Sequence, residues 1–228
     1  GIIGRRMTDN LFLTRDIIQD SISKNIKLKI ISVDQRKAFD NISHKYIFKV
    51  LEHLNLGDFF IKNIKRIYNN SFAIILLNGI ASEKFSISSG IKQGCPLSMM
   101  LYILAIEELI LNIKENNNIK GYTLNINQRF EIKISAYADD IVGYVVDENS
   151  IKEFFIEFDK WGEISGASLN REKTKILRIL DKQDTQEIKI LGIVFNRNGI
   201  SGCNLQETLK KIDTAINIWK LVKSNILE

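Results

Sequence analysis

Three aspartates stand where segments with the composition of buried strands come to an end. Asp34 follows the apolar run 28–33, and Asp139 and Asp140 lie between the runs 130–136 and 141–146, where they would form a hairpin tip. A carboxylate beside a buried strand is costly unless it is paired, hydrogen-bonded or bound to a metal ion, and adjacent carboxylates repel each other. Three such carboxylates suit a site for two Mg²⁺ ions that supports in-line displacement at phosphorus. Taken singly, each aspartate is also typical of a turn, a helix cap or a salt bridge.

A sheet with helices packed against it would hold these carboxylates in place. Hydrophobic periodicity predicts both kinds of element. Asn78-Gly79 is a typical tight turn between two strand-like segments. Helices and strands are mixed without regular βαβ alternation, so we expect an α+β fold. The predicted helices are 8–24, 43–54, 58–68, 97–113, 151–164 and 205–222, and the predicted strands are 28–33, 72–77, 84–87, 122–126, 130–136, 141–146, 175–180 and 188–195.

The composition is that of a globular protein large enough for one large or two small domains. Of 228 residues, 45% are hydrophobic and 26% are charged, which excludes a disordered tail. The net charge of +5 makes nucleic acid a plausible partner, although the excess is small. Cys95 and Cys203 lack the spacing of a zinc site or a disulfide framework, which favours a reducing compartment. No apolar run reaches the roughly 18 residues of a membrane span, so we expect an intracellular chain with no membrane partner.

Six short motifs occur in the chain, and two of them contain the three aspartates. In chain order they are GRRMTDN at 4–10, VDQRKAFDNISH at 33–44, GIKQGCPLS at 90–98, AYADD at 136–140, the pairs WG, SG, LN and KT within 161–174, and ILGI at 190–193. These segments resemble the fingers motif and motifs A to E of reverse transcriptases, in the form typical of LINE-type non-LTR retrotransposons. The YADD segment by itself would be a weak signal, but six motifs in the right order are a strong one.

The resemblance implies roles for the aspartates that agree with the chemistry inferred from the residues alone. Asp34, Asp139 and Asp140 would be catalytic residues that hold two Mg²⁺ ions, with Mn²⁺ as an alternative ion. The backbone carbonyl of Gln35 would be a further metal ligand. The reaction implied is attack of a primer 3′-hydroxyl on the α-phosphate of a dNTP, with release of pyrophosphate. Asp40, six residues beyond Asp34 and next to a predicted helix, is interpreted as a helix cap and not as a ligand.

The resemblance also assigns residues to the incoming nucleotide. Phe39 would lie under the sugar, where a bulky ring clashes with a 2′-hydroxyl and selects deoxynucleotides. Gln93 and Gly94 would let the backbone approach the template and the nucleotide. Lys173 would protonate or neutralise the leaving pyrophosphate, and Arg5 would contact phosphates or template. Without the resemblance, these residues would be interpreted as a core phenylalanine, a loop before a helix and solvated basic residues.

The fold implied by the resemblance is a right-hand polymerase palm with partial fingers and the start of a thumb. Residues 1–33 would be partial fingers and the lead-in to the palm, and 34–195 would be the palm with a fingers insertion. Residues 196–228 would be the connection to the thumb and its first helix. The upstream fingers and the rest of the thumb would belong to other parts of a parent protein.

The function implied is RNA-directed DNA synthesis for retrotransposition, with an RNA template, a DNA primer and dNTPs as partners and the nucleus as the location. Two alternatives stay open. One is a reverse transcriptase and maturase of the group II intron type, although the sequence QGCPLS at 93–98 fits LINE-like elements better. The other is a decayed copy that only binds RNA, against which the three intact aspartates argue.

Overall fold

The structure is a computed structural model that describes residues 4, 6–69, 71–125, 129–181 and 187–226. Helices and short antiparallel strands follow one another irregularly along the chain, so the predicted α+β class is confirmed. Within this described part, no helix has both the length and the apolar character needed to cross a membrane.

The centre of the molecule is a four-stranded antiparallel sheet with the strand order β10-β1-β9-β8. Strand β1 (Leu28–Val33) lies between β9 (Asp140–Val145) and β10 (Lys175–Ile179). Strand β8 (Ile134–Tyr137) forms a hairpin with β9. Isoleucine, leucine and valine are frequent in β1 because both faces of a central strand are covered. Since β1 and β9 are antiparallel neighbours, the end of β1 lies beside the start of β9.

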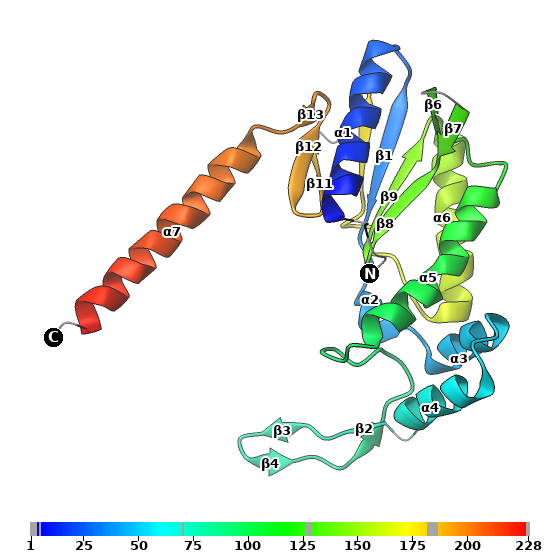
Figure 1. Ribbon diagram of the computed structural model, residues 1–228, viewed down its shortest axis with the longest axis vertical. Coiled ribbons are helices and arrows are strands. Elements are labelled where there is room, and N and C mark those ends of the chain that lie inside the picture. The colour runs from blue at the N-terminus through cyan, green and yellow to red at the C-terminus, as the bar shows by residue number, and fades with distance from the viewer. Residues whose placement is uncertain (1–3, 5, 70, 126–128, 182–186, 227–228) are drawn as a thin grey trace.

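Helices cover both faces of this sheet (Figure 1). Helix α1 (Met7–Ser23) packs on one face, and α5 (Ser98–Glu115) and α6 (Glu148–Ser165) pack on the other. The side chains of β1 alternate between two buried clusters, so that Ile30 belongs to the α1 side and Ile31 to the α5 and α6 side. This double packing fixes the register of β1, because a shift by one residue would exchange the two faces.

Three helices follow β1 and extend the part of the core that α5 and α6 form. They are α2 (Ala38–Asn41), α3 (His44–His53) and α4 (Asp58–Tyr68). Helix α3 packs against α5 and α6, and the Trp161 indole N–H donates a buried hydrogen bond of 3.0 Å to the Tyr46 hydroxyl. Helix α2 was not predicted, because four residues are too few to show a helical period.

The chain between α4 and α5 forms the predicted hairpin, which projects from the body of the molecule (Figure 1). Strand β2 (Phe72–Ala73) pairs with β5 (Phe85–Ser86), and β3 (Leu76–Leu77) pairs with β4 (Ile80–Ala81). Asn78-Gly79 forms the tip with φ angles of 50° and 81°, as a type I′ turn requires. The prediction of a hairpin closed at these two residues is confirmed, but the predicted strand 72–77 is wrong as a single element, because it is divided into β2 and β3, and β4 lies outside the predicted strand 84–87.

The predicted strand 130–136 is wrong as a single element. Strand β7 (Arg129–Ile132) pairs with β6 (Tyr122–Asn125) in a separate two-stranded sheet, while the residues that follow join the central sheet as β8. Between β7 and β8, Lys133 is buried and donates to the carbonyls of Lys114 and Asn116 at 2.9 and 2.8 Å. Its ammonium thus satisfies carbonyls at the end of α5, where positive charge is favourable.

The predicted strand 188–195 is also wrong as a single element. Strands β11 (Glu187–Ile190) and β12 (Ile193–Asn196) form a hairpin, and β13 (Gly199–Ile200) adds a third strand. The turn is Leu191-Gly192, with φ angles of 49° and 82°. A leucine at positive φ is uncommon, and the apolar residues around this turn make it look like a continuous strand.

The last helix, α7 (Cys203–Ile226), points away from the sheet (Figure 1). It includes the predicted helix 205–222 and is longer at both ends. Its exposed residues include Leu209, Ile212 and Ile216, which are 46–51% exposed.

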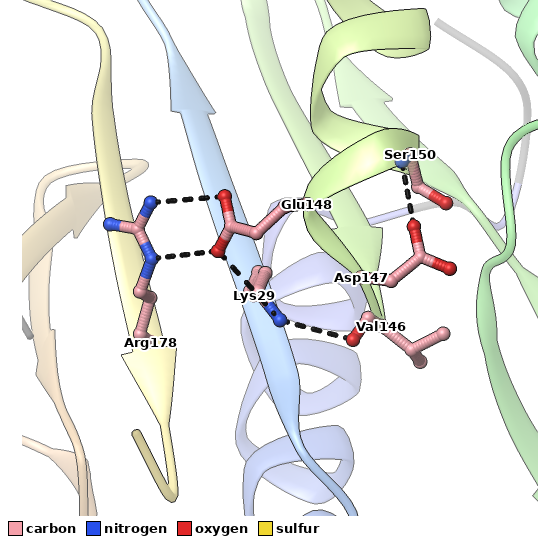
Figure 2. Close-up of polar contacts among 6 residues, drawn as sticks. All are labelled: Lys29, Val146, Asp147, Glu148, Ser150 and Arg178. Carbon is pink, nitrogen blue, oxygen red and sulfur yellow. Dashed lines mark hydrogen bonds and ion pairs between the residues drawn. The ribbon is translucent and has the colours of Figure 1, made fainter. Parts of the chain in front are cut away.

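A cluster of charged residues joins β1, β10 and the start of α6 (Figure 2). It lies near the first residues of β1, whereas Asp34 follows the last residue of that strand. Lys29 is buried, and its ammonium donates to the Val146 carbonyl at 3.0 Å and lies 4.0 Å from the Glu148 carboxylate. The Arg178 guanidinium lies 3.2 Å from the same carboxylate. These contacts compensate the cost of burying the Lys29 charge and attach α6 to the sheet.

Candidate active site

The end of β1 and the start of β9 bring Asp34 and Asp140 to the same place. Val33 pairs with Ile141, and one step further along these antiparallel strands Asp34 stands opposite Asp140. Asp139 directly precedes Asp140 in the tip of the β8–β9 hairpin. Asp34 is partly buried, and Asp139 and Asp140 are exposed. The three predicted aspartates are therefore gathered at one end of the central sheet, as the sequence led us to expect.

Within the described part of the chain, no basic side chain forms an ion pair that balances the negative charge at this end of the sheet. The pKa of Asp140 is raised above its ordinary value, first because nearby protein atoms partly desolvate its carboxylate and then by the negative charges of Asp139 and Asp34. Among the described residues, no lysine, arginine or histidine forms an ion pair with any of the three aspartates. Like charges held together without a counter-charge favour the binding of a cation.

The donor atoms fit a hard divalent cation, because carboxylate and carbonyl oxygens are the ligands that Mg²⁺ prefers. However, the described part of the chain contains no group of three acidic, thiol or imidazole side chains already placed around one metal position. The aspartates are gathered but not in a coordinating arrangement. The side chains of Asp139 and Asp140 are exposed at the hairpin tip, so a cation can reach them from solvent.

Asp34 is held by the turn that follows α6. Its backbone N–H donates to Thr174 Oγ1 at 3.2 Å, and the Thr174 hydroxyl donates to the Asn170 carbonyl at 2.9 Å. The Asn170 N–H in turn donates to the Asp34 carbonyl at 2.8 Å. From the sequence, Thr174 belongs to a motif but has no assigned role, because the pattern does not show that this turn closes on the end of β1.

The backbone of Gln35 is available beside Asp34. Gln35 forms an isolated antiparallel bridge with Leu169. Two hydrogen bonds flank this bridge. The Arg36 N–H donates to the Ser168 carbonyl at 2.9 Å, and the Asn170 N–H donates to the Asp34 carbonyl at 2.8 Å. In such a pair the bridging residues exchange no hydrogen bonds, so the bridge leaves the Gln35 carbonyl unused. Its role as a metal ligand stays a prediction.

Phe39 packs on α5, the helix that follows the motif at 90–98. Its ring lies 4.5 Å from the Tyr102 ring, centroid to centroid, at an interplanar angle of 31°. The Phe39 carbonyl also accepts a hydrogen bond of 2.7 Å from the Ile91 N–H. The ring is partly buried against the core and partly open. This position agrees with packing against the core, and the predicted contact with a sugar stays a prediction.

The loop before α5 carries Gln93 and Gly94, both exposed. Gln93 Nε2 donates to Asp40 Oδ1 at 3.2 Å. The interpretation of Asp40 as a helix cap is wrong, since Asp40 lies inside α2 and its carboxylate accepts this bond instead. Gly94 has a φ of +80° with open space around it, so the backbone conformation, and not a close contact, favours glycine there.

Of the two predicted basic residues, the structure describes Lys173, and it shows no contact of this side chain with the aspartates. Lys173 is exposed in the turn that holds Asp34, and its ammonium has no hydrogen bond or ion pair within the described parts of the chain. It is therefore free to meet an anion from solvent. Arg5 lies outside the described residues.

Comparison with known proteins connects this site to a family. Residues 4–195 match the family described as "Reverse transcriptase (RNA-dependent DNA polymerase)". The chain is 32% identical over 139 residues to the Transposon TX1 uncharacterized 149 kDa protein of Xenopus laevis, covering 61% of the chain and 10% of that protein. It is 25% identical over 224 residues to the Pol polyprotein of the type-2 retrotransposable element R2DM of Drosophila melanogaster, covering 88% of the chain and 21% of that protein. The chain thus spans between 10% and 21% of these relatives.

Solved structures of telomerase share the fold. Telomerase from Candida albicans, in complex with the TWJ fragment of telomeric RNA, gives a TM-score of 0.61 at 14% identity, covering 86% of this chain and 34% of that one. Apo telomerase from Candida tropicalis gives 0.58 at 12% identity, covering 85% and 35%. The predicted right-hand polymerase palm is confirmed by this likeness, and the predicted resemblance to LINE-type retrotransposon proteins by the relatives. The chain belongs to the reverse transcriptase (RNA-dependent DNA polymerase) family.

Proposed function

We propose that this chain is an RNA-directed DNA polymerase that extends a primer 3′-hydroxyl with dNTPs. The observation that carries the proposal is the gathering of Asp34, Asp139 and Asp140 at the junction of β1 and β9 in a member of this family. No basic residue among those described balances their charge, which is what a site for divalent cations needs. The palm would be formed by 34–195, between partial fingers and a first thumb helix.

The three aspartates and the Gln35 carbonyl would hold two Mg²⁺ ions, for which Mn²⁺ could substitute. When bound, the ions would activate the primer 3′-hydroxyl and stabilise the charge that develops at the α-phosphate. The protein contributes the placement of the ligands. Thr174 fixes the backbone of Asp34 through a hydrogen bond, and the β8–β9 hairpin supplies the other two carboxylates from a rigid sheet.

Other residues would bind and select the nucleotide. Phe39, kept in place by the Tyr102 ring, would exclude a 2′-hydroxyl by steric overlap. Gln93 and Gly94 would line the nucleotide and template from the loop before α5. The free ammonium of Lys173 would neutralise the leaving pyrophosphate, a role that needs a positive charge and no fixed partner.

We propose an RNA template and a DNA primer as the macromolecular partners. The support is the family, whose description specifies RNA-dependent DNA synthesis, and the net charge of +5, which suits a polyanion. The names of the relatives, which include a retrotransposable element, favour retrotransposition as the setting. Retrotransposition into chromosomal DNA would take place in the nucleus.

Primer extension tests this function. The purified chain is given a labelled DNA primer annealed to an RNA template, dNTPs and Mg²⁺, and the same reaction is run with EDTA and with rNTPs in place of dNTPs. We expect primer elongation that depends on Mg²⁺ and on dNTPs. Binding of the primed RNA in a gel-shift assay without elongation would overturn the proposal in favour of an RNA-binding protein.

A further inference from the structure

A buried histidine joins the loop before α5 to the helix that follows α2. His44 is the first residue of α3 and is 7% exposed, and its Nε2 atom lies 2.7 Å from the Gly90 carbonyl oxygen. A carbonyl oxygen only accepts, so Nε2 carries the hydrogen of this bond. His44 is the last residue of the motif at 33–44, and the resemblance to reverse transcriptases assigns it no role.

The His44 imidazole is held in a fixed orientation by its neighbours. The Tyr68 ring lies 4.9 Å from the imidazole, centroid to centroid, at an interplanar angle of 68°. Helix α3 is itself attached to α5, because the Tyr46 hydroxyl donates to the Ala105 carbonyl at 2.9 Å. A donor on a rigid, packed element loses little freedom when it forms its bond. His44 Nε2 is therefore a pre-oriented donor that faces the start of the loop.

Backbone contacts attach the start of the loop to the same part of the chain. The Gly90 N–H donates to the Ile42 carbonyl at 2.8 Å, and the Ile91 N–H donates to the Phe39 carbonyl at 2.7 Å. A Cβ on Gly90 would lie 2.9 Å from the Asp40 carbonyl oxygen, which shows how closely the two backbones approach. The start of the loop is thus fixed to the motif at 33–44 by two backbone bonds and by one side chain from α3.

The middle of the loop faces solvent. Gln93 and Gly94 are exposed, and Gln93 Nε2 donates to Asp40 Oδ1 at 3.2 Å. On the side of α5, the Ser98 hydroxyl donates to the Lys92 carbonyl. The residues predicted to meet the nucleotide and template therefore lie between two anchored ends, and the place of each end decides where they point.

We propose that His44 is a positioning residue that keeps this loop in the conformation that receives the nucleotide, through its bond to the Gly90 carbonyl. The inference rests on the proposed function, in which Phe39 and Gln93 contact the incoming nucleotide. Without the His44 donor, the Gly90 carbonyl loses its side-chain partner and the loop populates other conformations. The apparent affinity for dNTP then falls by the fraction of chains in which the loop is in place.

This role differs measurably from a purely structural one. A residue that only stabilises the fold changes the fraction of active chains, which lowers the maximal rate and leaves the half-saturating dNTP concentration unchanged. A residue that keeps a binding loop in place changes the half-saturating concentration. It leaves the maximal rate unchanged, because the loop is in place once the nucleotide is bound.

The test is single-turnover incorporation of one dNTP on a primed RNA template with Mg²⁺. His44→Phe keeps a ring beside Tyr68 and removes the donor, whereas His44→Gln keeps a side-chain N–H. His53→Phe, at the exposed last residue of α3, makes the same chemical change away from the loop. Hydrogen exchange of the Gly90 and Ile91 amides, followed by NMR, reports on the loop without turnover.

We expect His44→Phe to raise the half-saturating dNTP concentration roughly 3- to 10-fold, as loss of one hydrogen bond would, with the maximal rate within about twofold of that of the parent chain. The Gly90 and Ile91 amides should exchange faster by a similar factor. His44→Gln should restore most of both properties, and His53→Phe should change neither.

Two results would overturn the role of His44. One is a His44→Phe chain in which only the maximal rate falls, and the other is a His44→Phe chain whose Gly90 and Ile91 amides exchange as in the parent chain. A parent chain that binds the primed template and incorporates no dNTP would instead overturn the proposed function.

Discussion

At the scale of single residues, Asp140 shows the effect of gathering three carboxylates, because its pKa is raised. Its ionised form is disfavoured by partial desolvation and by its two acidic neighbours. Side chains held in such an unfavourable state are typical of functional sites, where binding is favoured at the expense of stability. The cost should therefore be measurable in the protein without metal and should disappear when a cation is bound.

Asp140→Asn should stabilise the metal-free chain. Removing one of the negative charges relieves the repulsion from Asp139 and Asp34, and we expect the unfolding free energy in EDTA at pH 7 to rise by up to about 1 kcal/mol. With added Mg²⁺, the parent chain should have the higher unfolding free energy of the two, because only the parent chain retains all the metal ligands. Urea unfolding with and without Mg²⁺ measures this. An Asn variant that is less stable in EDTA would contradict the site.

Phe39→Val should weaken discrimination against ribonucleotides. A smaller side chain makes room for a 2′-hydroxyl, so the ratio of kcat/KM for rNTP to that for dNTP should rise by at least about tenfold. Because the Phe39 ring also packs on Tyr102, some loss of stability accompanies the change. Phe72→Val, on the projecting hairpin, is the control for a general effect of losing a ring. An unchanged ratio would leave Phe39 with a packing role only.

At the scale of elements, the loop before α5 and the start of α6 show what holds the motifs in place. A Cβ on Gly90 would lie 2.9 Å from the Asp40 carbonyl oxygen, and its φ is +90°. The Gly90 carbonyl also accepts a bond of 2.7 Å from His44 Nε2. The start of this loop is thus clamped to α2 and α3, whereas Gly94 further along has open space around it.

Gly90→Ala should therefore be more destabilising than Gly94→Ala. Both place an alanine at positive φ, which costs roughly 1–2 kcal/mol, but only Gly90→Ala adds a backbone overlap. We expect a loss of roughly 2–4 kcal/mol for Gly90→Ala, consistent with strain plus displacement of the loop. Urea unfolding of both variants decides the matter. Equal losses would mean that the approach to Asp40 relaxes without cost.

Helix α6 begins at a carboxylate cap, visible in Figure 2. Asp147 accepts the Ser150 N–H at 2.7 Å. Burial alone would raise the pKa of Asp147, but hydrogen bonds from Ser150 and the charges of Lys120 and Lys29 outweigh it and lower the pKa. A carboxyl with a lowered pKa stabilises the fold above its unfolded pKa of about 4 and loses this effect as the pH falls.

Asp147→Ala should lower the unfolding free energy by about 1 kcal/mol at pH 7. The difference from the parent chain should shrink below about pH 4, because the parent carboxyl then becomes protonated. Urea unfolding at a series of pH values measures it. Asp159→Ala, which removes an exposed carboxylate within the same helix, is the control. A loss that is the same at pH 3 and pH 7 would exclude a charged cap.

At the scale of the whole molecule, periodicity and turn chemistry predicted the main elements, and the motifs predicted which strand ends would meet. The errors in the predicted strands came from residues whose role a local sequence pattern does not reveal. Lys133 interrupts a strand because it reaches the end of α5, and Leu191-Gly192 forms a turn that apolar neighbours conceal. Local pattern also gave no sign of the Gln35 side chain at the hairpin tip, since that contact joins residues 104 positions apart.

The most direct test of the whole molecule is the rate of Mg²⁺-dependent dNTP incorporation on a primed RNA template by Asp139→Asn, compared with Asp16→Asn. Asp16 is an exposed carboxylate on α1 that pairs with Arg15, so its variant makes the same chemical change away from the site. We expect Asp139→Asn to lower the rate at least about 100-fold and Asp16→Asn to leave it unchanged. Incorporation by Asp139→Asn at the rate of Asp16→Asn would contradict the assignment of the active site.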